Sequence, residues 1–142
     1  MRKNNWLFYF IYSLILVSYS IFISNILIFE KEQSQRTYSS LSLIIWSMIL
    51  FVVLGLLLGL EKFLYEMKKE GKWKINLPKL ILLGVPSLYF SLGIFVLCIP
   101  ITPIRQTLSY PIFYLLKYDN IISIFQVILG YIIITSFIKV KK

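Results

Sequence analysis

The sequence predicts an all-α integral membrane protein, an antiparallel bundle of four transmembrane helices with both termini in the cytoplasm. The first observation is the composition, because 58% of the 142 residues are hydrophobic, 15% are charged and the mean hydropathy is +0.81. Soluble globular domains are much less apolar. The second is that the apolar residues gather into four long segments, and the third is that most lysines lie between or after these segments. We therefore expect residues 1–142 to form one membrane domain.

Residues 6–29 form the first predicted span. Two basic residues precede this run, as they do in a secretory signal. A signal has an apolar core of about 7–15 residues and then a cleavage site of small residues, whereas this run continues without a charge up to Glu30. We expect it to remain as a helix, with Trp6 and Tyr9 at the headgroup layer.

Residues 41–60 form the second predicted span, because they carry no charge and have about the length needed to cross a hydrocarbon core of roughly 30 Å. Apolar residues continue at helical spacing into the charged stretch that follows, at Leu60, Phe63, Leu64 and Met67. This pattern predicts a cytoplasmic extension of the helix to about residue 70, ended by Gly71 in a left-handed conformation. Glu66 and Lys69 are spaced to pair on the other face.

Residues 78–99 form the third predicted span. Asn76, Leu77 and Pro78 mark its start, because the missing amide of a proline has no role in a first helical turn. Pro86 lies inside the span and predicts a kink.

Residues 121–138 form the fourth predicted span. The stretch before it, residues 101–119, is apolar but interrupted by prolines and charges. We expect that stretch to lie at the outer membrane interface, with a re-entrant loop as the alternative if protein covers its backbone.

Basic residues orient this topology, since they are retained on the cytoplasmic side of a membrane. Eleven of them fall in the segments assigned to the cytoplasm and four in those assigned to the outside. The expected location is the bacterial cytoplasmic membrane, with several passes. The net charge of +9 does not indicate nucleic-acid binding, because the basic residues lie in short loops and near the ends of the chain.

The residue types argue against an enzyme. The chain has no histidine and one cysteine, and the predicted spans contain no Asp, Glu, Lys, Arg or His between their ends. Intramembrane serines therefore lack a base, and proton relays lack their carboxylates. We expect no catalytic residue, no metal site and no cofactor.

Small and polar residues recur on one side of each predicted span and are expected to pack the helices together. They are Ser13, Ser20, Ser24, Gly55, Gly59, Ser87, Ser91, Ser123, Gln126 and Gly130. The alternative is that these residues line a polar path.

The function predicted from these features is that of a non-enzymatic accessory or interaction subunit. Its basic cytoplasmic hairpin would contact anionic lipid headgroups or a partner protein, through Lys62, Lys68, Lys69, Lys72, Trp73 and Lys74. The alternative function is a component of an oligomeric transporter or channel. Besides the bilayer itself, a membrane protein partner and a second copy of the chain are the expected partners.

Overall fold

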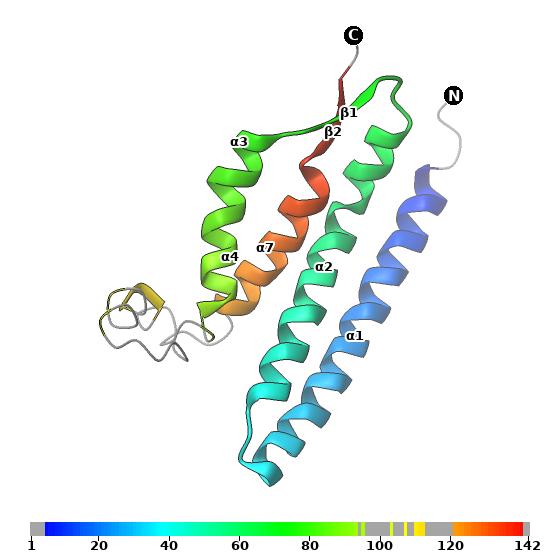
Figure 1. The fold of residues 1–142 in the computed structure, drawn as a ribbon. Helices are drawn as coiled ribbons and strands as arrows, with labels where there is room; N and C mark the ends of the chain where they lie inside the picture. The colour runs from blue at the N-terminus through cyan, green and yellow to red at the C-terminus, as the bar shows by residue number, and fades with distance from the viewer. Residues whose placement is uncertain are drawn as a thin grey trace. The chain divides into compact units, whose positions relative to one another are not determined.

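The computed structural model describes residues 5–93, 95, 103, 107, 110–112 and 121–140. The structure is mostly helical (84%), and Figure 1 gives the order of its elements. Contacts divide the chain into two compact units, residues 1–50 and residues 51–142. Each unit is described separately below.

The first unit contains α1, Asn5–Thr37, and the first part of α2, Leu41–Met67. Helix α1 continues about two turns beyond the predicted span 6–29. These added residues are polar but include Glu, Lys, Gln and Arg, which are good helix formers. Tyr38 then adopts a left-handed conformation with φ of 53°, so that only residues 38–40 connect the two helices.

Helices α1 and α2 are tied together within the first unit by two hydrogen bonds. The Ser42 hydroxyl donates to Glu30 Oε2 (2.6 Å), and the Tyr19 hydroxyl donates to the Leu50 carbonyl (3.0 Å). Ile23 and Leu50 are buried. The two helices α1 and α2 are both long and apolar enough to cross a membrane.

Helix α2 continues into the charged stretch but ends at Met67, a few residues before the predicted end. The Lys69 amide donates to the Glu66 carbonyl three residues earlier (3.1 Å), which is the tighter turn common at helix ends. Gly71 has a positive φ of 145°, but it lies beyond the turn that ends the helix. The predicted pairing of Glu66 with Lys69 is confirmed.

The third helical run begins where it was predicted to begin. It consists of α3 (Leu77–Lys79), the π-helical turn η1 (Leu80–Gly84) and α4 (Val85–Ser91). The Asn76 side chain caps it by accepting from the Lys79 amide (3.3 Å). The π turn ends two residues before Pro86, which has no amide to donate, so a local widening of the helix accompanies the proline. Most of the rest of the predicted span, and most of residues 101–119, lie outside the described residues.

The last helix, α7, spans Ile121–Thr135 and is shorter than the predicted span 121–138. The chain leaves the helix to form β2, Phe137–Val140, which pairs antiparallel with β1, Lys72–Ile75. The all-α prediction missed this two-stranded sheet. Both strands are rich in aromatic and β-branched residues, which favour extended structure.

Candidate interaction surface

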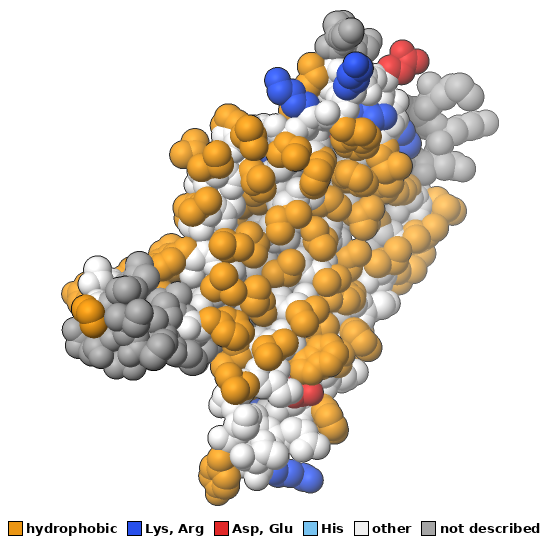
Figure 2. Space-filling view, in the orientation of Figure 1, with side chains coloured by type: hydrophobic (Ala, Val, Ile, Leu, Met, Phe, Trp, Pro, Cys, Tyr) orange, Lys and Arg blue, Asp and Glu red, His pale blue; other side chains and the backbone are white. Residues whose placement is uncertain are grey.

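One end of the second unit carries its described lysines. Here α2 ends, α3 begins and α7 passes into β2, so that the sheet lies beside three helix ends (Figure 1). We call the surface formed by residues 61–75 and 137–140 the basic surface. Figure 2 shows blue lysine side chains gathered at this end, above a face covered by hydrophobic side chains.

Glu66 anchors the basic surface. Glu66 is only 5% exposed, and its carboxylate accepts hydrogen bonds from Lys69 Nζ and from the Lys139 amide (3.1 Å). The hydrogen bond from Lys69, and then that from Lys139, hold the pKa of Glu66 below its usual value. Since Glu66 lies beyond the apolar stretch 41–60, this carboxylate joins the end of α2 to the outer edge of β2.

Lys139 holds the same junction from the other side. Its Nζ donates to the carbonyl groups of Met67 and Lys69 (2.9 Å each), which lie at the end of α2 where a helix favours a cation. It also lies 5.1 Å from the centre of the Trp73 ring, and that ring stacks on Phe63 at 5.5 Å. Lys139 and Trp73 therefore bind the sheet to α2.

Lys79 plays a comparable part at the start of the third helical run. Its ammonium donates to the hydroxyl of Thr135 and to the carbonyl of the same residue (3.4 Å), at the end of α7. It lies 5.3 Å from the centre of the Tyr131 ring. Lys79 thus joins two helix ends.

The residues predicted to contact lipid or a partner fall into two groups. Lys69 is paired with Glu66 and Trp73 packs on Phe63, so these two help to build the surface. The other four are exposed and have no hydrogen bond or ion pair within the part of the chain that the structure describes; they are Lys62, Lys68, Lys72 and Lys74. Among the six predicted residues, these four therefore leave their ammonium groups exposed in the described part of the chain.

The predicted packing glycines lie where α2 crosses α7. A Cβ atom on Gly55 would come within 2.0 Å of the Val127 carbonyl oxygen, and one on Gly130 within 2.0 Å of the Val52 carbonyl oxygen. Only a residue without a side chain fits at such a contact. A Cβ on Gly59 would instead meet the Ile134 side chain, at 2.2 Å.

The predicted packing serines differ in their burial. Ser87 and Ser91 are buried on α4 and donate to carbonyl groups within the same helical run, those of Leu83 in η1 (2.7 Å) and Leu88 in α4 (2.9 Å). The serines of α1 lie on its exposed side, namely Ser13, Ser20 and Ser24. The last two also donate to carbonyl groups of α1. Contact between these α1 serines and another helix stays a prediction.

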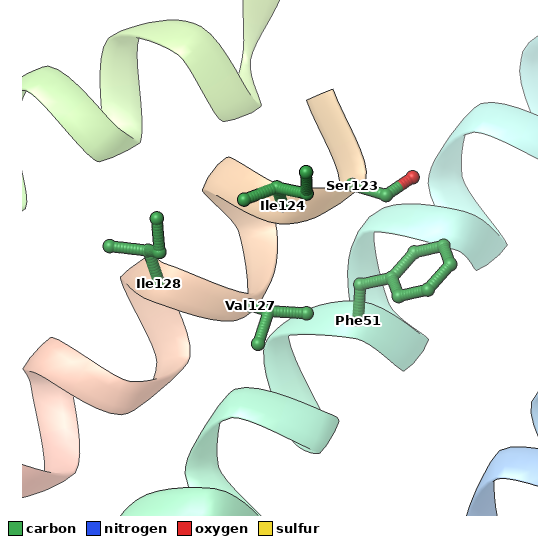
Figure 3. A pocket seen from close by; sticks show the side chains of 5 residues that line it. All are labelled: Phe51, Ser123, Ile124, Val127 and Ile128. Atoms are coloured by element: carbon green, nitrogen blue, oxygen red, sulfur yellow. The ribbon is translucent and has the colours of Figure 1, made fainter. Parts of the chain in front are cut away.

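Gln126 and Ser123 lie on α7 in different surroundings. Gln126 is 3% exposed, and its Oε1 has no hydrogen-bond partner within the described residues. Ser123 lines an open groove of about 350 Å³ between α2 and α7 (Figure 3), whose other lining residues are Phe51, Ile124, Val127 and Ile128. One hydroxyl among apolar side chains suits a hydrocarbon chain better than a polar solute.

Sequence reasoning missed the role of Lys139 and the strand pairing. Alternation of lysine with apolar residues in Lys72–Ile75 was the available signal, since a period of two is typical of a strand.

No cluster of three or more metal-binding side chains occurs among residues that the structure describes. Comparison with protein-family models, curated proteins and solved structures finds no match for this chain.

Proposed function

We propose that this chain is a non-enzymatic, multi-pass membrane protein whose basic surface docks on anionic lipid headgroups. In this proposal it crosses a bacterial cytoplasmic membrane four times, with both termini in the cytoplasm. Helices α1 and α2 have the required length and apolarity. The shorter helices support the proposal by their place, since α7 packs against α2 and α4 packs against α7. The end of α2, the start of α3 and the end of α7 would then share one side.

The observation that carries the proposal is the set of four exposed lysines that make no hydrogen bond or ion pair among the described residues, Lys62, Lys68, Lys72 and Lys74. Each basic residue close to an anionic leaflet contributes about 1 kcal/mol, so four would contribute about 4 kcal/mol together. The ties made by Glu66 and Lys139 hold these lysines on a folded surface. This arrangement costs less entropy on docking than a flexible basic tail would.

The rival function, an oligomeric transporter or channel, needs a hydrated path along the small residues. At the α2–α7 crossing the glycines bring two backbones into contact, which leaves no room for a solute. The groove beside Ser123 is lined mainly by apolar side chains (Figure 3). These observations favour the interaction function.

The test is amide hydrogen exchange of residues 68–75 in the full-length protein, reconstituted in nanodiscs of neutral lipid or of neutral lipid mixed with anionic lipid. We expect slower exchange with anionic lipid, and faster exchange again when salt shortens the Debye length. The variant Lys72→Gln/Lys74→Gln should lose most of this protection. The matched control is Lys31→Gln/Arg36→Gln, which removes the same charge from exposed residues near the end of α1.

Equal exchange in the two lipids would contradict lipid docking. Equal loss of protection in the control variant would mean that net charge, rather than the basic surface, is responsible. Protection that appears only after a cell extract is added would point to a protein as the ligand of this surface.

A further inference from the structure

The hydrogen bonds of β1 follow a definite alternation. In an antiparallel pair, opposed residues alternate between those that exchange backbone hydrogen bonds and those whose N–H and C=O groups point away from the partner strand. The Asn76 amide donates to the Ser136 carbonyl (2.9 Å), and Lys74 is paired with Ile138 two residues further into the sheet. By this alternation, the backbone groups of Lys74 and Lys72 also form hydrogen bonds with β2.

Trp73 and Ile75 are the other two residues of the alternation, so their backbone groups point outward. Lys139 lies opposite Trp73, and its amide donates away from β1, to Glu66. This confirms that Trp73 and Lys139 do not exchange backbone hydrogen bonds. The two outer edges of the sheet consequently differ. Glu66 covers the edge of β2, whereas the outward groups of Trp73 and Ile75 have no hydrogen-bond partner among the described residues. Both residues are about half exposed, at 48% and 45%.

Positive charge flanks this open edge. Lys72 and Lys74 point to the same face of β1, because side chains two residues apart do so in a strand. Both are exposed and unpaired within the described part of the chain, and Lys68 lies just before the strand with the same properties. A ligand of this edge should therefore carry negative side chains at every second position.

We propose that the open edge of β1 binds an extended acidic segment of a partner protein, which adds to the sheet as a third strand. In strand addition, backbone hydrogen bonds supply affinity and alternate side chains supply specificity. A second copy of β1 is a poor occupant, because antiparallel pairing of two Lys-Trp-Lys-Ile strands through Trp73 and Ile75 places lysines in directly opposite or diagonal positions. The proposal goes beyond lipid docking and can hold if lipid docking fails.

The test uses the full-length protein in nanodiscs of neutral lipid, so that anionic headgroups cannot compete. The probe is a labelled seven-residue peptide of alternating valine and glutamate, and its binding is followed by fluorescence anisotropy. A second peptide of the same sequence is N-methylated at alternate residues, which removes the amides that would pair with β1. We expect the first peptide to bind and the second to bind at least tenfold more weakly.

Two variants of one residue test the edge from the protein side. Ile75→Pro removes an outward amide only, and proline is tolerated on an edge strand in that position. It should weaken peptide binding about tenfold, while the exchange rate of the Lys74 amide, which bonds to β2, stays as in the wild type. Ile75→Thr keeps the amide and should bind as the wild type does.

The proposal is overturned if the N-methylated peptide binds as well as the unmodified one, because charge alone would then explain binding. It is also overturned if neither peptide binds in neutral lipid. In that case Lys72 and Lys74 serve to keep other strands away from an exposed edge, as lysines on edge strands commonly do. Because the peptide comparison leaves the protein unchanged, it decides the question even if Ile75→Pro fails to fold.

Discussion

At the α2–α7 crossing the contact is between backbones, whereas at the basic surface long side chains reach across to the backbone of another element. Because Gly55 and Gly130 have no side chain, a carbonyl group of the opposite helix can lie directly against each of them. Glu66 and Lys139 instead span the space between α2 and β2 with charged groups. The first contact depends on shape alone and the second depends on charge. The two regions should therefore respond to different perturbations, although α2 takes part in both.

Alanine at a crossing glycine should have the largest effect. Gly55→Ala or Gly130→Ala forces a methyl group against a carbonyl oxygen, and overpacking of this kind typically costs 1–3 kcal/mol or more. Gly59→Ala meets a side chain that can shift, and should cost less. The measurement is unfolding of the purified protein in mixed detergent micelles.

Gly84→Ala is the matched control, because its Cβ would find its nearest neighbour at 3.7 Å, an ordinary contact. It should leave stability unchanged or raise it by up to about 1 kcal/mol through helix propensity. If all four alanine variants lose the same stability, the α2–α7 crossing is not the close contact described here.

Glu66→Ala should have a smaller and more local effect. It removes the acceptor of the Lys139 amide and the partner of Lys69, so exchange of the Lys139 amide should rise roughly tenfold or more. Unfolding of the helices should change little, because the crossing contains no part of this network. Glu70→Gln, which neutralises an exposed neighbouring carboxylate, is the control. An equal rise in that variant would rule out a specific role for Glu66.

Acid should have the smallest effect, confined to the basic surface. The folded pKa of Glu66 lies below its unfolded value, so its contribution is fully present above the unfolded pKa and is lost as the pH falls through the folded pKa. The amide proton resonance of Lys139 should therefore shift only at a pH below the usual pKa of a glutamate side chain. The Gly130 amide should show no such shift, because its neighbours on α2, Val52 and Leu56, carry no carboxyl group. Matching shifts at both amides would mean that the two regions are coupled.

Local features of this fold were predictable from the sequence. The start of the third helical run follows from Asn76 and Pro78, and the pair Glu66–Lys69 follows from helical spacing. Each depends on residues within a single turn. Such interactions need no knowledge of the remaining fold.

The sheet could not be predicted in the same way. The chain of Phe137–Val140 continues the apolar pattern of α7, and only its pairing with Lys72–Ile75 distinguishes a strand from a last helical turn. That pairing depends on how the α2 end, α3 and α7 come together in space. The same applies to Lys139, whose two carbonyl partners, Met67 and Lys69, lie at and just beyond the end of α2. The sequence around Lys139 does not indicate that its side chain donates to carbonyl groups about 70 residues earlier in the chain.

The pairing of β1 with β2 also has a consequence for synthesis of the protein. Residue 140 leaves the ribosome 65 residues after residue 75, which corresponds to roughly 3–13 s at about 5–20 residues per second. During that interval β1 has emerged but residues 137–140 have not, so both edges of β1 lack a partner strand. A nascent chain halted just before residue 137 would therefore display a basic, half-apolar strand with no partner. The sheet closes only when the last helix has been made, so its formation reports that the chain has been completed through residue 140.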